Sequence, residues 1–219
     1  MTILFSQCWD VLPDKYDDYS DFVSNQYNPG LENLGIKFLG GYYVAVGEGP
    51  RIVAVATVDQ QTNLLNTLAG SEFRVLSTGL IQMVSNYGSR VWISSGRVHE
   101  EPYRIQTGAW KFTQRYNIVR GKEDDHYRFV KEECIPCMKS LKIPLTGGWR
   151  LAIGSGPRTL AESTGRTIET IAAAINTSEF RQLVRTLKKR YATDYSSRIL
   201  TPTGRIEVPF LMREMMKGF

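Results

Sequence analysis

Residues 40–51 read GGYYVAVGEGPR and residues 147–158 read GGWRLAIGSGPR, so seven of twelve positions are identical in two stretches 107 residues apart. At the same offset, the Ser-Glu-Phe-Arg sequence of residues 71–74 recurs at residues 178–181. Matches of this kind in one order indicate that a whole domain is duplicated, because solenoid repeats have periods of only about 20–50 residues.

The repeat predicts how the chain is divided. A first copy spans residues 1–97, a linker spans 98–106, a second copy spans 107–204, and a tail spans 205–219. The tail has no counterpart in the first copy and is rich in methionine and other apolar residues. Such a segment is expected to dock on its own chain or on an identical one, which would make a homo-oligomer through the tail.

Composition and charge exclude several classes of protein. The chain has 219 residues, of which 42% are hydrophobic and 22% charged, as in globular domains rather than disordered or collagenous ones. No apolar run approaches the ~20 residues of a membrane span, and the first residues lack the basic start of a signal peptide. Three cysteines cannot pair completely, which favours the cytoplasm. A net charge of +5 is too mild to indicate nucleic acid as a partner.

Hydrophobic periodicity predicts the same order of elements in both copies, namely βαββαβ. In the first copy, a helix that Pro29 ends or kinks follows the first strand, and a Gly-rich turn joins the second and third strands. This order predicts an α+β fold, a ferredoxin-like domain with both helices on one face of a four-stranded antiparallel sheet. The two bare faces are expected to meet and form a barrel. The predicted elements are strands 3–9, 42–46, 51–58 and 87–93, a two-piece helix broken at 70–72, strands 108–116, 148–153, 158–164 and 195–201, and helices 122–140 and 167–191.

The element order, the GGxxxAxGxGPR hairpin and the long second helix with Ser-Glu-Phe-Arg resemble the dimeric α+β barrel superfamily. This superfamily includes antibiotic-biosynthesis monooxygenase-like, NIPSNAP-like and EthD-like proteins, and chlorite dismutase-like proteins with two repeats per chain. The resemblance implies a pseudo-dimeric barrel made by one chain. It also implies a choice among cofactor-free oxygenases, haem enzymes, isomerases and proteins without known activity, because the fold does not fix the function.

Alternation along the strands predicts which side chains line the barrel interior. On the strand 108–116, the aromatic residues would face the helices, and Lys111 and Arg115 would face inward. The same reasoning places Tyr43, Arg150 and Arg198 inside. These five residues are the predicted ligand-binding set, and they would orient a small anionic or aromatic molecule by charge-assisted hydrogen bonds and stacking. The alternative is a packed interior from which the arginines extend to solvent.

Few residues are available for catalysis. The chain has only two histidines, which argues against sites that need several imidazoles, whereas haem needs one axial ligand. Glu162 and His126 are the only general-base candidates, and a buried neutral imidazole is the simpler interpretation of His126. The Cys134-x-x-Cys137 pair lacks further ligands, so no metal site is predicted. The cofactor is therefore none or haem.

Two classes of function remain open. In the first, the barrel binds a small molecule and acts as a cofactor-independent or haem-dependent oxygenase or isomerase. In the second, the chain is a non-catalytic interaction or structural module that uses a basic helix at residues 180–191 and the Met-rich tail. Whether the chain is an enzyme does not follow from the sequence alone.

Overall fold

The computed structural model describes residues 3–58, 63–96, 98 and 108–203. The predicted linker, apart from Val98, and the predicted tail with its homo-oligomer contact lie outside the described residues. The division of the chain at residues 97 and 107 stays a prediction for the same reason. No helix in the described part of the chain is long and apolar enough to cross a membrane.

The N-terminal half, residues 3–94, follows the predicted order of elements. The tyrosines and valines that recur at helical spacing after Asp14 form one buried stripe, whereas the strands are rich in β-branched and aromatic residues. Its elements are β1 (Ile3–Val11), α1 (Tyr16–Phe22), the π-helical turn η1 (Val23–Tyr27), α2 (Asn28–Asn33), β2 (Ile36–Val46), β3 (Ile52–Val58), α3 (Leu64–Ala69), α4 (Ser71–Ile81) and β4 (Val84–Ser94).

The C-terminal half, residues 110–202, has the same order of elements. Its second helix is in two pieces, as in the first half, because the Thr177 side chain caps a new helix by accepting from the backbone N–H of Phe180. Its elements are β5 (Trp110–Ile118), α5 (Glu123–Phe129), η2 (Val130–Cys134), α6 (Ile135–Ser140), β6 (Leu145–Ile153), β7 (Thr159–Gly165), α7 (Ile168–Ile175), α8 (Ser178–Arg190) and β8 (Ala192–Pro202).

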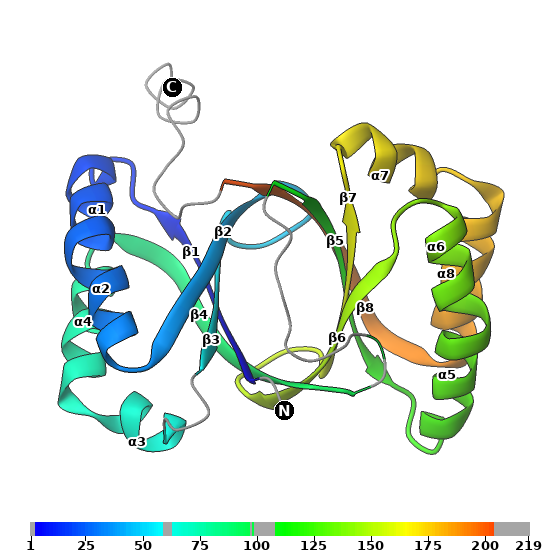
Figure 1. Ribbon diagram of the computed structural model, residues 1–219, viewed down its shortest axis with the longest axis horizontal. Helices are drawn as coiled ribbons and strands as arrows, with labels where there is room; N and C mark the ends of the chain where they lie inside the picture. Colours follow the sequence, from blue (N-terminus) through cyan, green and yellow to red (C-terminus); the bar gives the residue numbers. More distant parts are fainter. Residues whose placement is uncertain (1–2, 59–62, 97, 99–107, 204–219) are drawn as a thin grey trace.

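Eight antiparallel strands form one closed barrel in the order β1-β3-β2-β8-β5-β7-β6-β4. Each half supplies four consecutive strands, and its helices cover the outside of those strands (Figure 1). Two seams join the halves, because β2 pairs with β8 and β4 pairs with β6. The predicted meeting of the two sheets therefore takes the form of edge-to-edge hydrogen bonding as well as packing, and closure leaves no unpaired edge in the barrel.

The prediction left open whether Pro29 ends or kinks the first helix, and it extended the second-half helix 122–140 through Pro136. Pro29 and Pro136 do not end the helix, which continues as α2 and as α6. Each proline is the second residue after the end of a π-helical turn. The wider turn compensates for the missing proline N–H, so the helix continues past each proline.

The buried side chains form cores on both sides of the barrel wall. One cluster fills the barrel interior and includes Leu4, Tyr42, Trp92, Trp149 and Leu200. Other clusters lie between the wall and the helices, one in the N-terminal half and two in the C-terminal half. Most strands are consequently covered on both faces. A ligand can therefore bind only where the packing of one of these cores leaves a space.

Candidate functional site

The structure separates the predicted ligand-binding residues. Lys111, Arg115 and Arg198 line the barrel interior, as predicted. Arg150 lies on the other side of the wall, at a cavity beneath the C-terminal-half helices. Tyr43 packs against the N-terminal-half helical core. The five residues therefore do not form one site.

The prediction that Tyr43 and Arg150 point into the barrel is wrong. Their neighbours Tyr42 and Trp149 belong to the interior cluster. The prediction assumed that large aromatic residues would face the helices, but the barrel interior is equally apolar. Alternation cannot identify the inner face when both faces of a strand are buried.

Inside the barrel, Lys111 and Glu162 form a buried ion pair. Lys111 Nζ lies 2.9 Å from Glu162 Oε1, and both residues are at most 3% exposed. Trp149 Nε1 donates to the other carboxylate oxygen at 2.8 Å, and the ammonium lies 4.8 Å from the centre of the Tyr42 ring. The counterion Lys111 and the indole of Trp149 both donate to Glu162, so the geometry favours a structural role over that of a general base.

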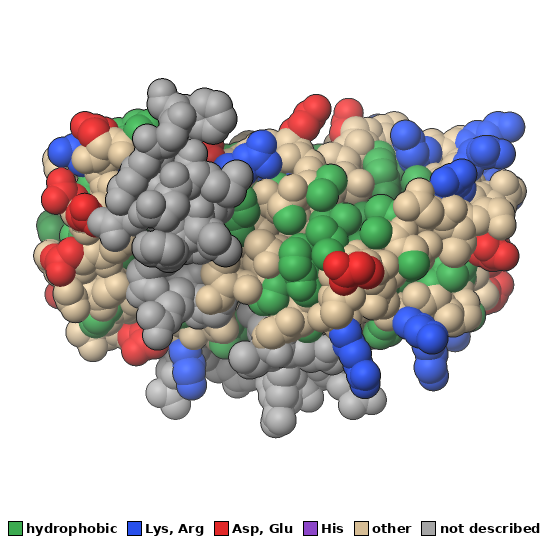
Figure 2. Space-filling model, turned by 90° about the horizontal axis from the view of Figure 1, so that it is seen from above, with side chains coloured by type: hydrophobic (Ala, Val, Ile, Leu, Met, Phe, Trp, Pro, Cys, Tyr) green, Lys and Arg blue, Asp and Glu red, His purple; other side chains and the backbone are tan. Residues whose placement is uncertain are grey.

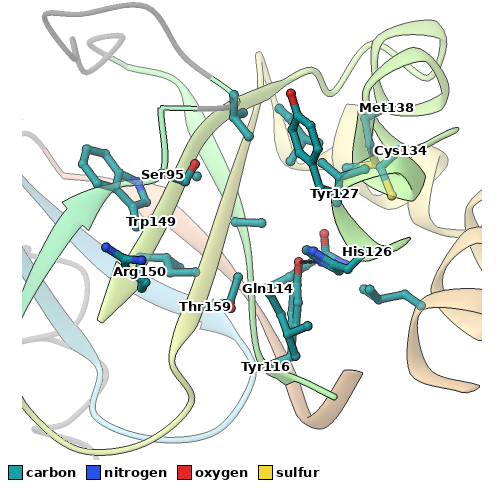
Figure 3. Close-up of a pocket in the computed structure, with 18 of the residues that line it drawn as sticks. Ser95, Gln114, Tyr116, His126, Tyr127, Cys134, Met138, Trp149, Arg150 and Thr159 are labelled. Carbon is teal, nitrogen blue, oxygen red and sulfur yellow. Dashed lines mark hydrogen bonds between the residues drawn. The ribbon is translucent and has the colours of Figure 1, made fainter. Parts of the chain in front are cut away.

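A cavity of about 300 Å³ in the C-terminal half brings several polar side chains together in a mostly apolar wall. It lies between the outer face of β5, β6 and β7 and the helices α5, η2, α6 and α8, and we call it the C-terminal-half cavity (Figure 3). Its volume is at the lower end of the range for small-molecule sites. Its lining is mostly apolar, and the polar side chains in it are Ser94, Ser95, Gln114, Tyr116, Glu123, His126, Tyr127, Cys134, Arg150 and Thr159.

His126 and Tyr116 form a hydrogen-bonded pair in the wall of this cavity. Tyr116 Oη lies 2.9 Å from His126 Nε2, and the two rings approach each other from β5 and α5 (Figure 3). Burial, followed by the nearby Cys134 and Tyr195, raises the pKa of Tyr116. The phenol therefore stays protonated at neutral pH, and the pair shares a proton whose position sets the imidazole tautomer.

The N-terminal half has the same hydrogen bond in the same place but with different residues. Trp9 Nε1 donates to Tyr19 Oη at 2.9 Å. The N-terminal half thus has an indole and a phenol at these positions, whereas the C-terminal half has an imidazole, the side chain that most often acts as a general base in enzymes. The substitution at these matched positions gives one half a group suited to proton transfer.

Cys134 opens the C-terminal-half cavity. In the N-terminal half, Tyr27 is the last residue of η1, is fully buried and accepts a hydrogen bond of 2.6 Å from Gln7. In the C-terminal half, Cys134 is the last residue of η2, and Gln114 donates a hydrogen bond of 2.8 Å to Tyr195 Oη. The small thiol occupies the place of a phenol ring. Comparing position 27 with position 134 in the repeat would have found this feature from sequence.

The described residues fit a compact ligand better than haem. His126 is the one histidine among them, and its Nε2 is already hydrogen-bonded to Tyr116 within a buried wall. A porphyrin would also need more room than this cavity gives. Within the described ranges, no group of three or more His, Cys, Asp or Glu side chains is placed to hold a metal ion.

No protein-family model matches the chain, and no curated protein matches it. Solved structures do share its fold. A proposed monooxygenase from Fusobacterium nucleatum has 12% identity and a TM-score of 0.60, with 94% of each chain covered. A proposed chlorite dismutase, TA0507, has 10% identity and a TM-score of 0.61, with 94% of this chain and 98% of that chain covered.

A haem-binding protein from Thermus thermophilus also matches along its length. It has 10% identity and a TM-score of 0.56, with 100% of this chain and 95% of that chain covered. Likeness at such low identity concerns the fold and not the chemistry. The chain thus has the ferredoxin-like α+β barrel fold that these monooxygenase-like and chlorite dismutase-like proteins share.

Proposed function

We propose that the C-terminal-half cavity binds a compact aromatic molecule that carries an acidic or anionic oxygen. We further propose that the chain acts on this molecule as a cofactor-independent oxygenase or isomerase. The observation that carries the proposal is the His126–Tyr116 pair, which stands in the wall of a largely apolar cavity. Oxygenases and isomerases of this class begin by removing a proton from their substrate, so they need a group that takes up a proton near neutral pH.

The lining of the cavity supports an aromatic ligand with one polar end. Apolar side chains from β5, η2, α6 and α8 supply most of the wall. Gln114 and Thr159 offer hydrogen bonds, and the exposed Arg150 places a cation at the cavity for a carboxylate or phenolate. A few polar groups in an apolar wall orient a ligand while excluding water from the reacting atoms.

In the proposed reaction, His126 and Tyr116 divide the work of proton transfer. The imidazole takes the proton from the ligand, and Tyr116 orients the ring through its hydrogen bond of 2.9 Å. Arg150 attracts the resulting anion toward its own side of the cavity. Each role uses a residue that this half has and the other half lacks.

The test is a binding and turnover assay with phenols, naphthols and hydroxybenzoates. Binding is measured as a rise in melting temperature, and turnover as oxygen uptake together with mass spectrometry of the products. The variant His126→Phe should keep most of the binding and lose turnover by about a hundredfold or more, the usual contribution of a general base. Tyr116→Phe should lower turnover less and shift its pH profile.

Tyr19→Phe is the matched control, because it removes the equivalent hydrogen bond in the N-terminal half. It should leave binding and turnover unchanged. If no aromatic compound stabilises the wild type, the proposed ligand class is wrong. If a compound binds and turns over equally in His126→Phe, the proposed role of His126 is wrong.

A second function has its own supporting observation on α8. Arg181, Arg185, Lys188 and Lys189 are exposed and form a shallow concave surface with Phe180 and Val184. Figure 2 shows basic side chains gathered at the end of the molecule that carries the C-terminal-half helices. An acidic protein segment would complement this surface. Fluorescence anisotropy with a glutamate-rich peptide tests it, and Arg181→Gln with Arg185→Gln should abolish any salt-dependent binding.

A further inference from the structure

A second and smaller space of about 50 Å³ lies inside the barrel, on the opposite side of β5 from the C-terminal-half cavity. Arg90 from β4, Arg115 from β5 and Arg198 from β8 line this space together with the buried thiol of Cys8. Arg90 Nη1 lies 3.5 Å from Cys8 Sγ. We call Arg90, Arg115 and Arg198 the arginine cluster.

No acid in the described part of the chain neutralises the arginine cluster. The buried Lys111 has its own counterion, Glu162. None of the ion pairs found among the described residues includes a member of the cluster. Asp10 is the acid whose charge acts on the cluster, because it raises the pKa of Arg198. Its two carboxylate oxygens already accept hydrogen bonds, one from the Arg51 backbone N–H and the other from Asn86.

The proximity of three cations is costly for the folded chain. Burial, and then the charges of Arg198 and Arg90, lowers the pKa of Arg115 to about 10. Burial is also the main reason that the pKa of Arg198 is lowered. Like charges that share a partly desolvated space destabilise one another unless an opposite charge is present.

The hairpins of the opposite halves hold two of these arginines in place. Arg90 Nε donates to the backbone carbonyl of Ser155 at 2.9 Å. Arg198 lies against the other hairpin, where a Cβ on Gly47 would come within 3.0 Å of its Cγ. The contacts orient the guanidinium groups, but a carbonyl group does not neutralise a charge.

We propose that the arginine cluster binds a compact inorganic oxyanion of the phosphate, sulfate or nitrate type inside the barrel. A space of about 50 Å³ holds roughly three to five water-sized spheres, which suits such an ion and excludes a larger organic anion. Guanidinium groups match the oxygens of these ions in geometry and charge. Since β4 and β8 each form a seam, the bound ion links the two halves and stabilises barrel closure.

The experiment measures inorganic phosphate binding to the full chain by isothermal titration calorimetry at constant ionic strength. The wild type should bind one phosphate, and Arg115→Gln should weaken binding by about tenfold or more, because one charge-assisted contact is lost. Lys188→Gln is the control, since it makes the same change of charge on the exposed surface of α8. It should bind phosphate as the wild type does.

Arg198→Lys provides a second test that does not depend on the folding of Arg115→Gln. It keeps the charge but loses the forked geometry, so binding should weaken by a smaller factor. If the wild type binds no phosphate at millimolar concentration, or if both cluster variants bind it as well as the wild type, the oxyanion site does not exist. Loss of binding in Lys188→Gln alone would place the phosphate on α8 and overturn the proposal equally.

Discussion

Tyr27 and Cys134 end the π-helical turns η1 and η2 at matched positions, and they differ by a whole phenol ring. Where Tyr27 stands, its ring packs against Trp9 and Phe22 and its hydroxyl accepts from Gln7. Where Cys134 stands, the chain has a cavity. A single residue in each half thus distinguishes a filled core from a candidate ligand site.

The substitution Cys134→Tyr should close the C-terminal-half cavity. The new hydroxyl can accept from Gln114 as Tyr27 does from Gln7, so the unfolding free energy should fall by no more than ~1–3 kcal/mol, the usual cost of overpacking. Aromatic ligands should then no longer raise the melting temperature. Cys137→Tyr is the control, because Cys137 is half-buried and does not line the cavity. Equal ligand binding by Cys134→Tyr and wild type would show that the ligand lies elsewhere.

The buried ion pair can be tested by copying the N-terminal half, where Leu4 and Val55 take the places of Lys111 and Glu162. Lys111→Leu alone should lower the unfolding free energy by about 3–5 kcal/mol, because it leaves a buried carboxylate without its counterion. Adding Glu162→Val should recover most of this loss. Urea unfolding of the two single variants and the double variant gives the coupling energy, and purely additive losses would contradict the pairing.

Stability should depend on pH at alkaline values through Cys134. Burial, and then Glu133 and Cys137, raises the pKa of this thiol in the folded chain, whereas an unfolded thiol titrates near 8.5. The folded chain therefore keeps a proton that the unfolded chain releases, and the unfolding free energy falls as pH rises above about 8.5, by up to ~1.36 kcal/mol per unit. Denaturant unfolding between pH 7 and 10 measures this slope. Cys134→Ala should show a shallower slope, and an unchanged slope would count against this assignment.

A chain ending at residue 97 should not remain a monomer. It would present β2 and β4 as unpaired edges, because their partners β8 and β6 belong to the other half, and it would expose the apolar interior face. We expect a homodimer that imitates the barrel, or aggregation, as measured by sedimentation velocity. A soluble monomer with native-like circular dichroism would contradict the predicted dependence of one half on the other.

The sequence predicted the order of elements in both halves and the two faces of the first strand in the C-terminal half. Lys111 and Arg115 do face the barrel interior, because β5 alternates clearly between polar and aromatic residues. The faces of β2 and β6 could not be read in this way, since Tyr42 and Trp149 are buried inside while Tyr43 packs outside. The alternation of polar and apolar residues distinguishes a buried face of a strand from an exposed one. It cannot tell the face toward the barrel interior from the face toward the helices when both are buried.

The cavity was harder to predict than the fold because it arises where a small side chain, Cys134, takes the place of a large one, Tyr27. From the sequence alone, Cys134 was considered only with Cys137 as a possible metal ligand, whereas its small size is what leaves room for the cavity. His126 was predicted to lie on the inner stripe of its helix, and the structure confirms that it is buried there. Its hydrogen bond to Tyr116 could not be deduced, since it joins two elements whose packing distance only the structure supplies.

The seam between β2 and β8 has a consequence for how the chain is made. β2 leaves the ribosome early, and the strand that pairs with it is the last strand of the barrel. Until β8 emerges, the finished N-terminal half carries an open edge and an apolar concave face in a crowded cell. The rate-limiting event in folding should then be the late closing of the ring, which makes the nascent chain a natural substrate for a chaperone that shields exposed strands.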